Sequence, residues 1–103
     1  MATTRYQFDW DPAKAAINLT KHGVAFDAAM TVFLDPLARS RFDKDNSDEE
    51  DRFVTLGEAK NGQLLVVVHT YVESAPDRVH IRIISARRPT GREARQYREG
   101  TEP

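Results

Sequence analysis

The sequence predicts a compact α+β domain, in which two N-terminal helices precede an antiparallel sheet of three to four strands and a C-terminal helix follows. Three observations predict it: a capped helix near the start, an Asn-Gly turn between two strand-like runs, and a capping-box motif near the end. The helices are expected to pack on one side of the sheet. A chain of 103 residues forms a single domain, with its core spanning from about residue 8 to residue 98.

The first helix is predicted over Pro12–His22. Asp11 is a suitable N-cap, and proline suits the first helical position, where no backbone donor is needed. Two cations, Lys21 and His22, fall in the last turn, where they complement the helix dipole. Gly23 is suited to the left-handed conformation that commonly ends a helix.

A second, shorter helix is predicted over Asp27–Phe33, with Asp27 as its cap. It ends before Pro36, because the residue preceding a proline avoids helical geometry. The pattern then favours a strand over Ala38–Phe42. The following segment, Asp43–Asp51, is poor in apolar residues and is predicted to be a loop or a solvated edge.

The middle of the chain predicts a hairpin. Strand-like residues at Arg52–Leu56 and Leu64–Tyr71 flank Asn61-Gly62, which favours the positive φ angles of a type I′ turn. The run Leu64–Val68 is continuously apolar, as expected of a central strand that is covered on both faces.

The C-terminal part predicts one more strand and a helix. Glu73–Asp77 contains a proline and is predicted to be a connection. Apolar and polar residues alternate over Val79–Ile83, which predicts a strand with one apolar face. Thr90 and Glu93 fit a capping box, so a helix is expected from there. Residues 100–103 are expected to fray.

The sequence contains no cysteine, which excludes disulfides, thiolate catalysis and thiolate zinc sites. The N-terminus has no apolar segment of signal-peptide length, and the longest apolar run is too short to span a bilayer. We therefore expect a cytoplasmic protein that makes no membrane contact.

Charge is unevenly distributed along the chain, although the net charge is only −1. Asp43–Asp51 carries six acids and one lysine, whereas Arg78–Arg98 carries seven arginines and one acid. A local basic face binds phosphates whatever the total charge is. The alternative is an ordinary solvated surface, because runs of charged residues usually form a solvated face.

Standard catalytic motifs are absent from the sequence. There is no P-loop, no dinucleotide-binding fingerprint and no HExxH motif, and no serine lies in a nucleophile elbow. The three histidines, His22, His69 and His80, are not spaced as local metal ligands. We therefore expect neither a cofactor nor a metal.

Arginines gather where a strand is predicted to meet the last helix. Arg82 lies on the polar side of the strand, Arg87 and Arg88 follow its end, and Arg92 and Arg95 are one helical turn apart. Guanidinium groups match phosphate oxygens in a bidentate fork, and a helix start adds backbone donors. This junction is thus a candidate phosphate site.

RNA carries its own nucleophile, the 2′-hydroxyl, so its cleavage requires only positioning, charge stabilisation and proton transfer. Candidates for proton transfer are His22, His80, Glu93 and Tyr97. Each also has a structural interpretation: helix capping for His22, a surface position for His80, the capping box for Glu93, and core packing for Tyr97. Arg52 is equally able to pair with the neighbouring acids.

The sequence resembles the BrnT family of toxins over nearly its whole length, from about Phe8 to Tyr97. The resemblance is carried by Phe8-Asp9-Trp10-Asp11-Pro12-x-Lys14, Asn18-x-x-Lys21-His22-Gly23-Val24-x-Phe26, Ala29, Val32-Phe33, Asp35-Pro36, Arg52, Gly57, Ile81-Arg82-Ile83-Ile84-Ser85-Ala86-Arg87-Arg88, Glu93 and Tyr97. Lys-His-Gly-Val together with Ile-Ser-Ala-Arg, in this order and separation, is a specific combination.

The resemblance implies a RelE-like fold and a ribonuclease toxin that inhibits translation. It also implies a partner, a BrnA-like ribbon-helix-helix antitoxin, in a complex of two toxins with two antitoxins. In such a complex the antitoxin, not the toxin, binds operator DNA. The acidic segment Asp43–Asp51 then becomes a candidate docking site for a basic part of the antitoxin.

The resemblance also suggests roles for individual residues. Arg87 and Arg88 would bind the phosphate and the transition state, with Arg52 and Arg82 in support, and His22, Glu93 and Tyr97 would be candidates for proton transfer. The RNA-binding set would be Lys21, Arg82, Arg87, Arg88 and Arg92. Two other hypotheses stay open: a catalytically inactive scaffold that acts only as a co-repressor, and direct DNA binding through the basic C-terminal half, which no helix-turn-helix pattern supports.

Overall fold

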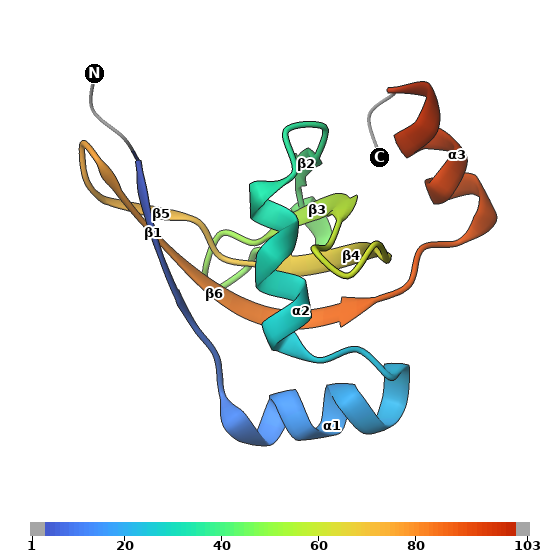
Figure 1. Ribbon diagram of the computed structural model, residues 1–103. Helices are drawn as coiled ribbons and strands as arrows, with labels where there is room; N and C mark the ends of the chain where they lie inside the picture. The colour runs from blue at the N-terminus through green and yellow to red at the C-terminus, as the bar shows by residue number, and fades with distance from the viewer. Residues whose placement is uncertain (1–3, 101–103) are drawn as a thin grey trace.

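The structure, a computed structural model, describes residues 4–100 and shows helices on both faces of one bent sheet (Figure 1). Its elements in chain order are β1 (Arg5–Asp9), α1 (Pro12–His22), α2 (Phe26–Met30), a 3-10 turn (Thr31–Leu34), β2 (Arg39–Phe42), a second 3-10 turn (Lys44–Asn46), β3 (Phe53–Glu58), β4 (Leu64–His69), β5 (Val72–Ala75), β6 (Arg78–Arg87) and α3 (Gly91–Glu99). The fraying expected after Gly100 concerns residues outside the described ones.

The sheet has six strands, not the three to four that the sequence predicts. Its order is β1-β6-β4-β3-β2, and β5 also pairs with β6. β1 runs parallel to β6, so the sheet is mixed rather than purely antiparallel. β5 replaces part of the connection predicted at Glu73–Asp77. Both unpredicted strands pair with β6 alone and expose most of their residues, so they lack a strong apolar pattern.

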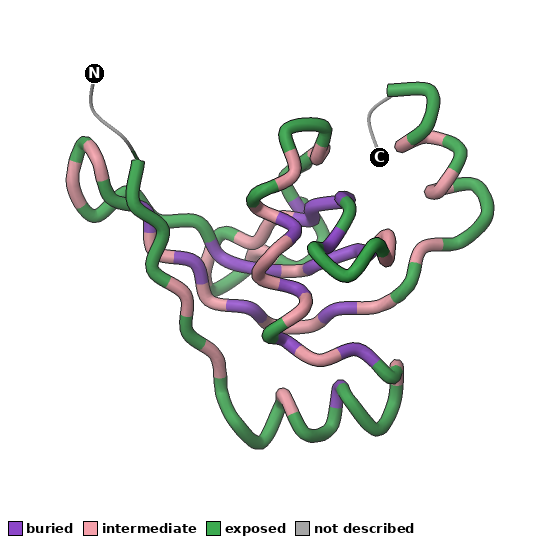
Figure 2. Tube along the Cα trace, in the orientation of Figure 1, coloured by how far each residue is buried: buried purple, intermediate pink, exposed green. Residues whose placement is uncertain are grey.

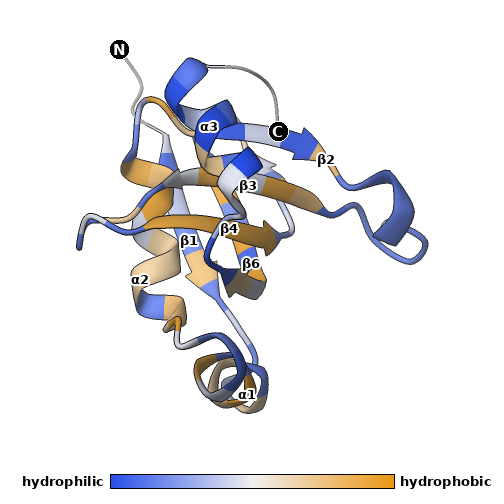
Figure 3. Ribbon diagram, turned by 90° about the vertical axis from the view of Figure 1, so that its right-hand side faces the viewer, coloured by the Kyte–Doolittle hydropathy of each residue, from blue (hydrophilic) through white to orange (hydrophobic). Residues whose placement is uncertain are grey.

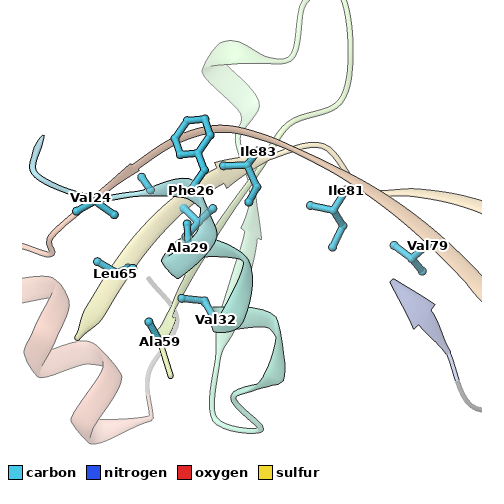
Figure 4. Packing of buried hydrophobic residues seen from close by; sticks show 11 residues of the cluster. Val24, Phe26, Ala29, Val32, Ala59, Leu65, Val79, Ile81 and Ile83 are labelled. Carbon is cyan, nitrogen blue, oxygen red and sulfur yellow. The ribbon is translucent and has the colours of Figure 1, made fainter. Parts of the chain in front are cut away.

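The apolar strand β4 is covered on both faces, as predicted. Leu65 and Val67 belong to the larger buried cluster, together with residues of α2 and β6 (Figure 4). The alternate residue Val66 belongs to a smaller cluster, against which Tyr97 of α3 packs. The prediction that all helices lie on one side is therefore wrong: α2 covers one face, and α3 contributes its tyrosine to the other. We call the face that α2 covers the core face. The opposite face, on which Arg82 and Arg87 lie, is called the arginine face.

A β-bulge in β6 decides which side chains reach the arginine face. Val68 pairs with Ser85, but the next residue of β4, His69, pairs with Ile83, so Ile84 is an extra residue. Arg82 lies between the buried Ile81 and Ile83 of the core face and therefore points away from it. Arg87 is five residues further on, and regular alternation would place it on the other face. The bulge cancels that switch, because an extra residue restores the parity of the strand.

The hairpin between β3 and β4 is present, but its turn differs from the prediction. The amide of Gly62 donates to the Ala59 carbonyl at 2.9 Å, and the amide of Ala59 donates to the Gln63 carbonyl at 2.7 Å. Gly62 has φ of 87°, while no described residue other than glycine has positive φ. A type I′ turn requires positive φ at both central residues, and Asn61 has negative φ. The two hydrogen bonds instead identify a type I turn followed by a glycine bulge.

Candidate functional site

Arginines from strands at opposite sides of β4 lie on the arginine face. Arg82 and Arg87 come from β6. Arg39 and Arg41 of β2 pair directly with Leu56 and Val54, which belong to the smaller cluster. Directly paired residues point to the same side of a sheet, so both β2 arginines share the face. Sequence reasoning missed these two, although the alternation Arg39-Ser40-Arg41 within a predicted strand was the available signal.

Arg87 is bound by the first turn of α3. Its two terminal nitrogens donate to the two carboxylate oxygens of Glu93 at 2.8 and 3.0 Å. The same carboxylate accepts the amide of Thr90 at 2.8 Å, and Thr90 Oγ1 accepts the Glu93 amide, which completes the predicted capping box. The ion pair with Arg87 lowers the pKa of Glu93 to about 2, because hydrogen bonds to a carboxylate favour its charged form.

Arg82 is bound by the acidic segment. Its guanidinium donates to Glu50 Oε1. The same oxygen lies 3.7 Å from a terminal nitrogen of Arg52, so one carboxylate bridges two arginines. The buried Nε of Arg52 has no hydrogen-bond partner among the described residues. The sequence alternative for Arg52, pairing with neighbouring acids, is thus realised through Glu50, although only as a long ion pair.

Tyr97 connects α3 to the sheet. Its ring packs against the cluster of Val54, Leu56 and Val66, and its hydroxyl donates to Asp35 Oδ2 at 2.6 Å. This hydrogen bond raises the pKa of Tyr97 to about 12, because ionisation would place a phenolate against a carboxylate. Tyr97 therefore stays protonated at neutral pH.

Comparisons with known proteins identify the family and the fold of this chain. The family described as "Ribonuclease toxin, BrnT, of type II toxin-antitoxin system" matches residues 10–93. The chain belongs to the BrnT family. The crystal structure of the Brucella abortus ribonuclease toxin BrnT matches with a TM-score of 0.58 over 84% of this chain and 99% of that chain. The sequence identity is 24%, so this match shows a shared fold. No curated protein matches.

Two motif residues of this BrnT chain make no direct polar contact with the arginines in the described part of the chain. Lys21 and His22 occupy the last turn of α1, and no hydrogen bond or ion pair joins them to the arginines within residues 4–100. Arg88 and Arg92 are exposed, beside the start of α3. His80 of β6 lies with Nε2 3.2 Å from Asp9 Oδ2.

The signature residue Asn18 has a positioning role that sequence reasoning did not assign. It is the only buried residue of α1, and the rest of this helix is largely exposed (Figure 2). Its amide nitrogen donates to the carbonyls of Val24 and Ala86 at 2.9 and 2.8 Å, and its oxygen accepts the Ala86 amide at 3.1 Å. Because β1 pairs only with Arg78–Arg82, Asn18 satisfies the strand edge that β1 leaves open next to Arg87.

Within residues 4–100, no group of three or more histidine, aspartate and glutamate side chains is arranged to hold a metal ion. Each helix in that part of the chain is too short or too polar to span a bilayer. The third histidine, His69, is a core residue: its Nδ1 donates to the Thr70 carbonyl at 2.8 Å, and Thr55 Oγ1 lies 2.6 Å from Nε2.

Proposed function

We propose that this BrnT toxin cleaves RNA by attack of the substrate's own 2′-hydroxyl, without a metal ion, and that the cleavage inhibits translation in the cytoplasm. A cognate BrnA-like ribbon-helix-helix antitoxin neutralises it, in a complex of two toxins and two antitoxins in which only the antitoxin binds operator DNA. Membership of the ribonuclease toxin family supports the activity. The metal-free chemistry rests on the residues of the arginine face.

The observation that carries the proposal is the placement of Arg82 and Arg87 on one sheet face by the bulge at Ile84. Both guanidinium groups are partly exposed, with 43% and 42% of their side chains accessible. RNA is a polyanion, and guanidinium groups bind phosphate oxygens through paired donors. Arg52, Arg88 and Arg92 extend this positive surface, and Lys21 belongs to the proposed RNA-binding set through its family motif.

In the proposed reaction, the 2′-oxygen bonds to phosphorus while the bond from phosphorus to the 5′-oxygen breaks. The products are a 2′,3′-cyclic phosphate and a 5′-hydroxyl, which takes its proton from solvent. Arg87 and Arg88 stabilise the added charge on the phosphorane oxygens, with Arg52 and Arg82 in support. His22 is retained as a proton acceptor, and His80, which Asp9 orients, is a second candidate.

Glu93 and Tyr97 were candidates for proton transfer, and their surroundings support positioning roles instead. A carboxylate with a pKa of about 2 has little affinity for a proton at neutral pH. A tyrosine with a pKa of about 12 already gives its hydrogen to Asp35. In the proposed mechanism Glu93 orients Arg87, and Tyr97 holds α3 against the sheet.

The test is cleavage of end-labelled single-stranded RNA in the presence of EDTA. The Arg87→Ala/Arg88→Ala variant is compared with Arg5→Ala/Arg78→Ala, which removes an arginine of β1 and its partner at the start of β6. We expect the wild type and the second variant to produce fragments ending in 2′,3′-cyclic phosphate, and the first to lose activity. Equal cutting by all three proteins indicates a contaminating nuclease, and loss of wild-type cutting in EDTA refutes the metal-free mechanism.

A catalytically inactive co-repressor remains the alternative, and one observation favours it. Both β6 arginines of the site are already paired with carboxylates of the chain, Glu93 and Glu50, which reduces their availability to RNA. Expression of the chain without its antitoxin separates the two functions. A ribonuclease arrests growth, whereas a scaffold leaves growth unchanged at the same protein level.

A further inference from the structure

We propose that Arg52 and Arg82 form a phosphate subsite that the chain's own Glu50 occupies, so that Glu50 sets the affinity for RNA by competing with a substrate phosphate. The inference rests on the proposed function and assigns a role to the acidic segment, for which the family resemblance suggests none beyond antitoxin docking. The ligand is an RNA backbone phosphate, which Glu50 mimics by offering a negative oxygen to two guanidinium groups.

The geometry of the three side chains supports competition rather than a permanent structural bridge. Glu50 contacts both arginines through a single carboxylate oxygen, Oε1. The three side chains are each about one-third or more exposed, at 34% for Glu50, 32% for Arg52 and 43% for Arg82. Exposed ion pairs of this kind contribute little net free energy, so a substrate phosphate is able to displace the carboxylate.

Arg52 shows that the carboxylate is an incomplete partner. Its nearest contact with Glu50 is 3.7 Å, which is too long for a hydrogen bond, so the carboxylate makes an ion pair with Arg52 but accepts no hydrogen bond from it. A guanidinium offers five donors, and a phosphodiester presents its two charged oxygens in a tetrahedral arrangement. A phosphate between Arg52 and Arg82 would therefore satisfy donors that Glu50 leaves unused.

The segment between β2 and β3, which carries Glu50, is fixed at its base and strongly hydrophilic (Figure 3). Its ends are joined by the Asp43 amide, which donates to the Arg52 carbonyl at 2.8 Å. Ser47 Oγ donates to the Asp43 carbonyl at 2.6 Å and accepts the Arg52 amide at 3.0 Å. These hydrogen bonds close the segment at its base. Glu50 therefore lies on a short loop whose two ends are fixed next to Arg52.

The charges around Arg82 indicate that Glu50 weakens RNA binding at this point. A cavity of about 450 Å³ beside this arginine is lined by four carboxylate side chains, Asp9, Glu50, Asp51 and Glu73, and by Arg82 and His80. With Glu50 in place, carboxylates outnumber cations here, which opposes the approach of RNA. Removal of the Glu50 charge releases Arg82 and reduces the repulsion at the same point.

The experiment compares Glu50→Gln with Asp48→Asn, which removes one charge from an exposed position of the same segment. Binding of a 2′-O-methyl RNA, which lacks the attacking hydroxyl, is measured by fluorescence anisotropy over a range of salt concentrations. We expect Glu50→Gln to bind roughly three- to tenfold more tightly. The slope of its log affinity against log salt concentration is expected to steepen by about 0.7 for each additional phosphate that the variant neutralises. Asp48→Asn should change affinity by less than about twofold, because Asp48 is exposed and no ion pair joins it to an arginine within residues 4–100.

The double variant Glu50→Gln/Arg82→Ala tests whether the tighter binding passes through the subsite. The increase in affinity is expected to disappear when Arg82 is absent. The inference is wrong if Glu50→Gln behaves as Asp48→Asn does, or if the increase persists without Arg82. It is also wrong if Glu50→Gln binds tightly but no longer cuts cleavable RNA, since Glu50 is then a catalytic group.

Failure of the proposed function has a different signature. If the wild type and every variant fold, as circular dichroism shows, yet none binds or cuts RNA, the ribonuclease assignment fails and the subsite fails with it. If wild-type cleavage depends on Arg87 while Glu50→Gln has no effect, only the subsite is refuted.

Discussion

Arg87 and Glu93 are joined by two hydrogen bonds, of 2.8 and 3.0 Å, that link the end of β6 to the first turn of α3. The same carboxylate completes the capping box by accepting the Thr90 amide. One side chain therefore starts a helix and orients an arginine. The sequence spacing of Glu93 fits both a helix cap and a catalytic base. In the structure its carboxylate oxygens accept hydrogen bonds from Arg87 and Thr90.

Glu93→Gln separates positioning from proton transfer. The neutral amide still accepts hydrogen bonds but loses the ion pair, so we expect a reduced rate of RNA cleavage and a pH profile of unchanged shape between pH 5 and 9. Glu93, with a pKa of about 2, is ionised throughout that range. If the acidic limb of the profile vanishes in the variant, Glu93 is itself the proton acceptor.

Glu93 also predicts how stability depends on acid. Its pKa is lower in the folded chain, about 2 against an ordinary 4.5, so its contribution is present above pH 4.5 and is lost as the pH falls towards 2. The side chains are partly exposed, and after allowance for solvent screening we expect a loss of about 1 kcal/mol. Urea unfolding of the wild type and Glu93→Gln from pH 2 to 6 measures it, and parallel curves would contradict it.

His69 predicts a second pH dependence, at higher pH. Its ring is 1% exposed, and burial lowers its pKa to about 4 from an ordinary 6.5. Nδ1 donates to the Thr70 carbonyl, so Nε2 accepts the Thr55 hydroxyl, and protonation would break that bond. The unfolded chain binds the proton more readily. Stability is therefore full above pH 6.5 and declines by about 3 kcal/mol as the pH falls to 4.

His69→Gln removes this titration, and its unfolding free energy should vary less between pH 4 and 6.5 than that of the wild type. His80→Gln is the matched control, because His80 is partly exposed and lies outside the core. The assignment to His69 is wrong if the control flattens the profile as much as the His69 variant does.

The helices and the central hairpin could be predicted because their signals are local. Asp11 caps α1, Gly23 ends it with φ of 68°, and Thr90 with Glu93 starts α3, each within a few residues of its effect. The continuous apolar run of β4 predicted its cover on both faces. These features depend on neighbours in sequence rather than on the rest of the fold.

The bulge at Ile84 and the edge strands depend on tertiary pairing, so the sequence does not display them. The spacing of Arg82 and Arg87 alone predicts opposite faces, and only the register between β4 and β6 places them together. Arg39 and Arg41 lie on a predicted strand and alternate visibly, but only the pairing of β2 with β3 shows which face they share. The composition did show an acidic segment, but not that Glu50 would return to Arg52 and Arg82.

Asn18→Ala should lower stability by about 2–4 kcal/mol. The variant leaves a buried amide and two carbonyls without their partner, and each unsatisfied group costs about 1–3 kcal/mol unless water reaches it. Thr20→Ala, an exposed change on the same helix, should have little effect. Because Asn18 holds the backbone of Ala86, cleavage per folded molecule should also fall. Unchanged cleavage in Asn18→Ala would show that Arg87 does not depend on this contact.

Gly57 lies where β3 meets the 3-10 turn that follows α2, and it tests how tightly these elements pack. A Cβ at this position would lie 2.7 Å from Val32 Cγ1 and 3.0 Å from Ala38 Cβ. Val32 is fully buried in the larger cluster, so we expect Gly57→Ala to destabilise the fold by about 1–3 kcal/mol. Gly91→Ala is the control: its Cβ meets nothing within 4 Å, and alanine favours the start of α3. Thermal unfolding should show a lower Tm for the first variant and an equal or higher Tm for the second. Equal Tm values for both variants would mean that β3 and Val32 accommodate the added methyl group without loss of stability.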